Sequence, residues 1–217
     1  TTNETVRILR AALEHAGAPV DLLQCVEKPS IPLAQALMSG CDLTIATGGP
    51  PMVRSAYSSG KPAYGVGAGN ATVIVDETAD VAQAAKNTRI SKTQNHGSGC
   101  SCDGNLLVDA SVYDALLDAL RQEGGHLAGP EEKARLEAVM WDAEGRRRIE
   151  TVARGARVIA EKAGITLPDD TTFIIVEETA IEKSHRFSSE KLAPVLATFK
   201  YSGFDQALRM VSEILDV

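Results

Sequence analysis

The chain has little of the chemistry that marks several classes of protein. Its 217 residues include four cysteines, too few and too irregularly spaced for a disulfide framework: Cys25, Cys41, Cys100 and Cys102. The longest aliphatic runs, such as TVIV at 72–75 and FIIV at 173–176, are only as long as a strand, so we expect no membrane span. A formal net charge of −7 lacks the basic excess of a nucleic-acid binder. We therefore expect a cytoplasmic protein with neither a nucleic acid nor a membrane as its partner.

The chain does have the composition of a folded protein. Hydrophobic residues make up 44% of it, enough to bury a core, and no internal repeat or low-complexity linker interrupts it. The one basic cluster, Arg146–Arg147–Arg148, lies in a segment with the pattern of a helix rich in acidic residues. We expect this cluster to be a solvated helix face.

Segments typical of strands and of helices alternate along the chain. We expect helices at 1–16, opened by a cap at Thr1, and at 31–40, 52–59, 77–93, 112–123, 130–141, 147–163 and 204–215. We expect strands at 21–27, 42–47, 61–67, 71–76, 105–111, 171–178 and 192–201. This alternation predicts an α/β fold whose parallel sheet is covered by helices on both faces. The series up to about residue 80 fits a nucleotide-binding sheet, in which ligands lie beyond the C-terminal ends of the strands.

Two glycine-bearing stretches follow expected strands. In ATGGPP (46–51), two glycines separate a strand from a helix, where they let a ligand approach the backbone near a helix N-terminus that attracts anions. The spacing is not GxGxxG, so an ordinary turn is the alternative. GVGAGN (65–70) has three glycines between two strands and is open to the same two interpretations.

The stretch SKTQNHGSGCSCDGN (91–105) poses the sharpest chemical question. His96, Cys100 and Cys102 are three candidate metal ligands, but a zinc site needs about four, so we expect no metal. A disulfide across one intervening residue would be strained. A nucleophilic thiol in a loop of small residues with many backbone N–H groups, or an inert loop thiol, both fit the spacing.

Several of these motifs, in this order, resemble the aldehyde dehydrogenase superfamily. The stretch ATGGPPMVRSAYSSGKPAYGVGAGN, then VDETAD, then SKTQNHGSGCSCDGN resemble its coenzyme A-acylating branch, which includes the aldehyde dehydrogenase half of bifunctional aldehyde–alcohol dehydrogenases and sulfoacetaldehyde dehydrogenases. SSEKLAPVL, near residue 190, is similar to the family's Glu-x-Phe-Gly-Pro-Val segment. The resemblance covers essentially all 217 residues.

The resemblance implies a role for particular residues. Cys100 matches the catalytic nucleophile, and Cys102 falls at a position where the family varies. The turn that the family places against the cofactor pyrophosphate matches Thr47, Gly48 and Gly49, and Gly67 lies in the glycine-rich stretch nearby. Glu190 matches the glutamate that hydrogen-bonds the nicotinamide ribose, with Leu192 and Ala193 in place of the usual Phe and Gly. The resemblance thus implies NAD or NADP as cofactor and coenzyme A as co-substrate.

One departure from the family bears on the type of reaction. Hydrolytic members carry a water-activating glutamate at the position of Val66, in a Glu-Leu-Gly-Gly-Lys segment whose lysine position is Asn70 here. Without that carboxylate the usual base for hydrolysis is missing. We therefore expect a short aldehyde to be oxidised to an acyl-coenzyme A through a cysteine thioester. A hydrolytic dehydrogenase and a non-catalytic nucleotide-binding fragment are the alternatives.

The resemblance also predicts how the chain is organised. We expect residues 1–92 to be part of an NAD(P)-binding domain and residues 93–217 part of the catalytic domain, with the family's fold truncated at both ends. A homo-oligomer is expected for the full-length protein. Acylating relatives use sulfoacetaldehyde, succinate semialdehyde or propionaldehyde, and the sequence does not choose among these substrates. The choice between NAD and NADP and a functional role for His96 also stay open.

Overall fold

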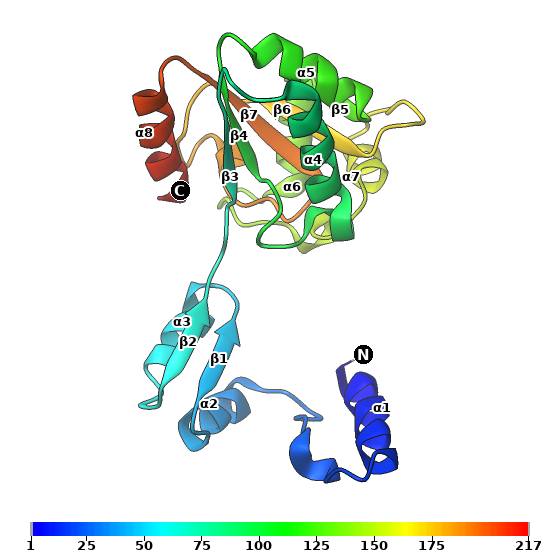
Figure 1. Cartoon of the computed structure of the whole chain (residues 1–217), viewed down its shortest axis with the longest axis vertical. Helices are drawn as coiled ribbons and strands as arrows, with labels where there is room; N and C mark the ends of the chain where they lie inside the picture. Colours follow the sequence, from blue (N-terminus) through cyan, green and yellow to red (C-terminus); the bar gives the residue numbers. More distant parts are fainter. Residues whose placement is uncertain (1, 217) are drawn as a thin grey trace. The chain divides into compact units, whose positions relative to one another are not determined.

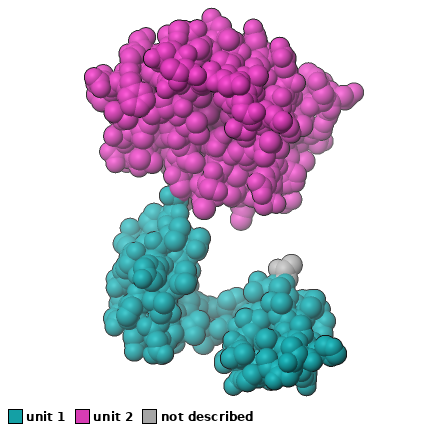
Figure 2. Space-filling view, in the orientation of Figure 1, with its two compact units in different colours: residues 1–68 teal, residues 69–217 magenta. Residues whose placement is uncertain are grey.

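The computed structural model describes residues 2–216 and divides the chain into two compact units, residues 1–68 and residues 69–217 (Figure 2). The expected cap at Thr1 lies outside the described residues. The division comes earlier than the boundary expected between residues 92 and 93, because the segment 72–93 joins the sheet and helices of the second unit. The cofactor-binding and catalytic roles assigned to the two parts stay predictions.

The first unit is built on a two-stranded sheet. Its elements are α1 (Thr2–His15), a 3-10 turn η1 (Val20–Leu22), α2 (Ile31–Gly40), β1 (Thr44–Thr47), α3 (Pro50–Tyr57) and β2 (Ala63–Val66). The strands β1 and β2 run parallel, and Ala46 of β1 packs with Met38 of α2 and Ala56 of α3. The other face of β1 is bare, since Ile45 is 74% exposed.

The strand expected at 21–27 is wrong. A strand exists only through a ladder of hydrogen bonds to a neighbour, and residues 20–27 pair with no strand in the described part of the chain. A 3-10 turn follows Pro19 instead, and Leu22 of the apolar run is 68% exposed. Apolar residues with nothing to pack against do not specify a strand.

The second unit is a five-stranded sheet with helices on both faces (Figure 1). Its strands are β3 (Thr72–Val75), β4 (Asn105–Asp109), β5 (Gly125–Leu127), β6 (Phe173–Glu177) and β7 (Val195–Tyr201), in the order β3-β4-β7-β6-β5. Every neighbouring pair is parallel. The helices are α4 (Val81–Thr93), α5 (Tyr113–Gln122), α6 (Pro130–Met140), α7 (Ala156–Lys162) and α8 (Phe204–Leu215), with 3-10 turns η2 (Gln94–Gly97), η3 (Ile149–Thr151) and η4 (Arg186–Ser188). The predicted α/β fold with a parallel sheet is confirmed.

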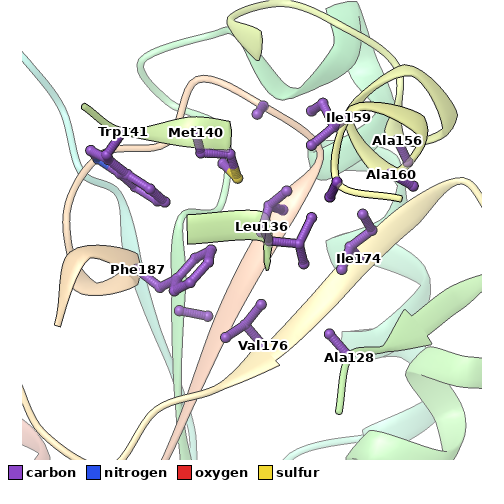
Figure 3. Packing of buried hydrophobic residues seen from close by; sticks show 14 of the residues in the cluster. Ala128, Leu136, Met140, Trp141, Ala156, Ile159, Ala160, Ile174, Val176 and Phe187 are labelled. Carbon is purple, nitrogen blue, oxygen red and sulfur yellow. The ribbon is translucent and has the colours of Figure 1, made fainter. Parts of the chain in front are cut away.

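Alternation along the strands divides the buried side chains of this unit into two cores. In β4, Leu106 and Val108 pack with α4 and α5, whereas Leu107 packs on the opposite face with α6, α7 and α8. Figure 3 shows part of the core that contains Leu107. There, side chains of α6 and α7 point toward Ile174 and Val176 of β6. The sheet is thereby buried on both faces, as a parallel sheet requires.

The helix expected at 147–163 begins only at Ala156. Arg147 instead forms an isolated antiparallel bridge with Trp141, and Ala153 has a φ of 53°, which no α-helix contains. The Arg147 guanidinium lies over the Trp141 ring, 4.8 Å from its centroid, and Nε donates to Lys191 O at 3.0 Å. Burial lowers the pKa of Arg147 to about 10. The expectation of a solvated helix face is therefore wrong for this arginine.

The remaining expected elements lie close to observed ones. The sequence did not predict β5, which has three residues and follows Gly124, whose φ is 89°. A strand this short shows no alternation to detect. No helix within residues 2–216 has both the length and the apolar character needed to cross a bilayer.

Candidate active site

Cys100 lies on a tight turn between α4 and β4. Cys102 N donates to Gly99 O at 3.0 Å and closes the turn, which leaves Cys100 exposed. Within residues 2–216, the backbone N–H groups of Gly99, Cys100 and Ser101 donate no hydrogen bond. An accessible sulfur thus lies beside unused backbone donors, the combination that a nucleophile and a developing oxyanion need.

The chain reaches this turn through an unusual backbone. After α4, Asn95, His96 and Gly97 follow one another in the left-handed region, with φ of 49°, 56° and 63°. A Cβ on Gly97 would lie 2.7 Å from Ala193 O and 2.9 Å from Lys92 O. Such conformations persist only where the surroundings hold them. The loop that carries Cys100 is therefore fixed against the segment that leads into β7.

Gly69 joins the predicted nucleophile to the predicted cofactor residue. Its N–H donates to Glu190 Oε1 at 2.9 Å, and a Cβ added to it would lie 2.1 Å from the carbonyl oxygen of Cys100. Only glycine allows so close an approach. Cys100 and Glu190 thus both lie against Gly69, which the sequence marked only as one glycine among several.

These residues share one edge of the sheet. Gly69 precedes β3, Cys100 precedes β4 and Glu190 precedes β7, which are three neighbouring strands in the sheet. Because the strands are parallel, their N-terminal ends meet at this edge. In the second unit the candidate site is therefore at the N-terminal edge, opposite to the C-terminal edge that open α/β sheets commonly use.

A buried lysine that the sequence did not single out lies near the loop. Lys92, on the last turn of α4, is 1% exposed. Burial lowers its pKa to about 8, against the opposing effect of Cys102, Asp103 and Glu190. Asp103 accepts from Ser91 Oγ at 3.0 Å, and burial raises the pKa of this carboxyl. An amphipathic pattern gives no signal for a lysine on the buried face of a helix.

Cys102 and His96 differ in their exposure to solvent. Cys102 is half-buried, and a Cβ on Gly99 would lie 3.1 Å from its Sγ. The His96 side chain is exposed, and its Nδ1 lies 3.7 Å from where a Cβ on Gly155 would be. A role for His96 in the chemistry stays a prediction.

The predicted pyrophosphate turn belongs to the first unit. Thr47 ends β1, Gly48 N donates to Val66 O at 3.0 Å, and Gly49 is the N-cap of α3. A Cβ on Gly48 would approach Met52 Cβ to 3.2 Å, whereas one on Gly67 would meet nothing within 4 Å. Prolines at 50 and 51 remove two N–H donors from the helix end. The turn therefore offers fewer backbone donors than its glycines suggest.

The two units together define a class: an α/β protein with a strand–glycine–helix turn in one unit and an accessible cysteine at the N-terminal edge of a parallel sheet in the other. The chain belongs to the aldehyde dehydrogenase family, whose model matches residues 1–214. The resemblance inferred from the motifs is confirmed.

The relatives of the chain include acylating dehydrogenases. The chain is 38% identical over 221 residues to sulfoacetaldehyde dehydrogenase (acylating) of Bilophila wadsworthia, covering 100% of this chain and 48% of that protein. It is 40% identical to the bifunctional aldehyde-alcohol dehydrogenase of Escherichia coli, covering 99% of this chain and 24% of the relative. The crystal structure of an acetylating aldehyde dehydrogenase from Geobacillus thermoglucosidasius superposes with a TM-score of 0.94 at 38% identity, covering 99% of this chain and 48% of that one. The chain thus spans about half the length of the acylating and acetylating relatives and about a quarter of the bifunctional one.

Proposed function

We propose that the protein carrying this chain is a coenzyme A-acylating aldehyde dehydrogenase that oxidises a short aldehyde to an acyl-coenzyme A with NAD or NADP. The observation that carries the proposal is the exposed Cys100 on a turn with unused N–H groups, separated from Glu190 only by Gly69. Relatives support the same reaction, since they include an acylating sulfoacetaldehyde dehydrogenase and an acetylating succinate-semialdehyde dehydrogenase.

A related structure supports a cysteine thioester. Propionaldehyde dehydrogenase of Rhodopseudomonas palustris, 28% identical and with a TM-score of 0.86, was solved with bound coenzyme A and an acylated cysteine. We assign the corresponding role in this chain to Cys100, the exposed thiol of the nucleophile loop.

The residues present suit a nicotinamide cofactor. Glu190 accepts from Gly69 with Oε1, and Oε2 has no protein partner within residues 2–216, so it is available to a ribose hydroxyl. Thr47, Gly48 and Gly49, with Gly67, would hold the pyrophosphate, for which the Gly49 N–H is free among the described residues. When bound, the nicotinamide supplies the hydride acceptor for oxidation of the aldehyde carbon.

The chain's own groups account for the other steps. The Cys100 thiolate attacks the aldehyde carbon, and the Cys100 N–H is placed to donate to the oxyanion that develops. After the carbon has lost its hydride, the acyl group remains on sulfur as a thioester. The thiolate of coenzyme A then attacks this carbonyl carbon, the bond to Cys100 breaks and acyl-coenzyme A leaves. Val66 stands where hydrolytic members have a carboxylate, so the chain offers water no base at that position.

The test follows reduction of the cofactor in the complete reading frame that contains this sequence. Short aldehydes, including sulfoacetaldehyde, succinate semialdehyde and propionaldehyde, are supplied with and without coenzyme A. We expect coenzyme A-dependent formation of NADH or NADPH that is lost in Cys100→Ser and kept in Cys102→Ser.

Other results separate the alternatives. Turnover that does not need coenzyme A and releases a free acid would mean a hydrolytic dehydrogenase. Cofactor binding without turnover, and without acylation of Cys100, would favour a nucleotide-binding protein. Loss of activity in Cys102→Ser alone would contradict the assignment of the nucleophile.

A further inference from the structure

Lys191 directly follows Glu190 and is buried, with 1% of its surface exposed. Its ammonium donates to Asn105 Oδ1 at 3.1 Å, to Ser189 O at 2.8 Å and to Phe187 O. These three acceptors match the three N–H bonds of a lysine. Among residues 2–216 no carboxylate forms an ion pair with it, although an unpaired buried charge is costly. The burial of Lys191 without an ion pair therefore indicates a specific structural role.

The acceptor side chain of Asn105 continues the network. Asn105 is fully buried at the start of β4, and its Nδ2 donates to Asn70 Oδ1 at 2.9 Å. Asn70 Nδ2 in turn donates to Ser188 O and to Ile214 O, each at 2.9 Å. Because an ammonium can only donate, Lys191 fixes which end of the Asn105 amide faces it. The direction of the whole chain of hydrogen bonds is therefore set by Lys191.

These contacts close into a ring that contains Glu190. The Glu190 carboxylate accepts a hydrogen bond from the N–H of Gly69, and Gly69 is joined to Asn70 by a peptide bond. The Asn70 side chain accepts from Asn105, and the Asn105 side chain accepts from Lys191. The peptide bond between Lys191 and Glu190 completes the ring. Asn70 has a φ of 43°, a conformation that its three side-chain hydrogen bonds help to hold. The ring ties together the segments that enter β3, β4 and β7.

We propose that Lys191 is a positioning residue, which with the Asn70–Asn105 pair fixes the Glu190 carboxylate against Gly69 and thereby the carbonyl of Cys100. Lys191 touches neither cofactor nor aldehyde in this scheme. It acts through Glu190, whose orientation sets cofactor affinity, and through Gly69, which bounds the nucleophile turn. The inference rests on the proposed function, in which Glu190 contacts the cofactor and Cys100 attacks the aldehyde.

The charge on Lys191 is consistent with a positioning role. Burial lowers the pKa of Lys191 well below its usual value, and the nearby cations Lys92 and Arg147 lower it further, against the carboxylates of Glu178 and Glu190. Three acceptors around Nζ nevertheless require three donors, which only the protonated form has. Replacing Lys191 with an apolar residue would leave the Asn105 oxygen without a partner in a buried place.

The test compares Lys191→Met with the unaltered protein in the complete reading frame. We expect KM for the nicotinamide cofactor and the Kd for its reduced form to rise by about tenfold or more, the size of loss typical of a hydrogen bond to a charged group. We expect the rate of Cys100 alkylation by iodoacetamide to change as well. KM for coenzyme A should stay nearly constant.

Two further variants separate positioning from general loss of stability. Leu116→Ala, in the core of α5 on the sheet, lowers the melting temperature without touching the ring. Asn105→Asp gives Lys191 a carboxylate to pair with but removes the donor to Asn70, so it cuts the ring while favouring a folded protein. We expect Asn105→Asp, like Lys191→Met, to weaken cofactor binding, and Leu116→Ala to leave it unchanged.

The outcomes for the ring and for the reaction are distinguishable. If the unaltered protein forms acyl-coenzyme A and both ring variants keep the cofactor KM of Leu116→Ala, the inference is overturned and the function stands. If the unaltered protein shows no turnover, the proposed function fails, and cofactor Kd with the Cys100 alkylation rate decides the inference. A cofactor Kd and a Cys100 alkylation rate in the ring variants equal to those of Leu116→Ala would overturn the inference. Larger changes of both quantities in the ring variants would support the inference. Should Lys191→Met fail to fold, Asn105→Asp gives the same decision.

Discussion

At the scale of the residue, the candidate site depends on Gly69 having no Cβ atom. Gly69 lies between Glu190 and Cys100, and its missing side chain leaves the space that the Cys100 carbonyl oxygen occupies. The resemblance assigns a cofactor role to Gly67 and no role of their own to Gly65 and Gly69. The structure separates them, since a Cβ on Gly67 would meet nothing within 4 Å. A glycine's neighbours in space, rather than its neighbours in sequence, decide whether it can be replaced.

Gly69→Ala tests this directly. We expect the added Cβ to push the Cys100 turn away and to lower the free energy of unfolding by about 1–3 kcal/mol, the usual cost of overpacking. We also expect slower alkylation of Cys100 by iodoacetamide. The measurements are urea unfolding and the alkylation rate. Gly129→Ala is the control, because a Cβ there meets nothing within 4 Å in the same unit. Equal stabilities for the two variants would contradict the steric argument.

Lys92 makes a second prediction at the scale of the residue, on the pH dependence of stability. Its pKa is about 8 in the folded protein, below the 10.5 of an unperturbed lysine, so between these values the unfolded chain binds more protons. Stability therefore rises with pH across this window, and below pH 8 the buried charge costs about 3 kcal/mol. Lys92→Met removes that cost.

Urea unfolding at pH 7 and at pH 9.5 measures the effect. Relative to the unaltered protein, Lys92→Met should be more stable at pH 7, and the difference should shrink as pH rises. Lys86→Met, which removes an exposed lysine from the same helix, is the matched control. A difference between Lys92→Met and the unaltered protein that does not vary with pH would show that Lys92 does not titrate in this window.

At the scale of the element, the sequence predicted best where burial on both faces left a clear pattern. The strands β4, β6 and β7 fall within the ranges expected for them, because their continuous apolar runs have few other uses. The range 21–27 has a similar run but no strand to pair with. The range 147–155 has helix-forming residues, but Arg147 is drawn into a contact with the Trp141 ring, which lies edge-on to Phe187 at 4.9 Å (Figure 3). The first failure is the lack of a neighbouring strand. The second depends on contacts of Arg147 with the Trp141 ring and with Lys191 O, which is 44 positions away in the sequence.

The same limit applies to the candidate site. Cys100 could be found from its loop of small residues and from resemblance, since its signal is local. The ring around Glu190 could not be found, because its hydrogen bonds join residues 35, 86 and 121 positions apart. The resemblance singles out Asn70 only because the family has a lysine at that position, and it does not single out Lys191. Polar contacts of this kind follow from the sheet order, in which β3, β4 and β7 become neighbours.

At the scale of the whole molecule, the two units differ in what holds them together. The second has a five-stranded sheet with a core on each face, whereas the first has two strands and a buried cluster of Met38, Ala46 and Ala56. Two strands with one covered face are marginal in water. Stability is therefore concentrated in residues 69–217, the unit that contains Cys100, Glu190 and the ring around them.

This difference predicts how the two parts behave when they are separated. The fragment 69–217 should fold alone, with a cooperative urea transition followed by far-UV circular dichroism and by Trp141 fluorescence at the same midpoint. The fragment 1–68 should show no such transition, since its apolar side chains, such as Ile45 at 74% exposure, lack a covering layer. In the folded 69–217 fragment, Lys191→Met should still alter the alkylation rate of Cys100, because the whole ring lies within this unit. A fragment 69–217 that unfolds without cooperativity would mean that its sheet depends on residues 1–68, and would contradict the assignment of stability to the second unit.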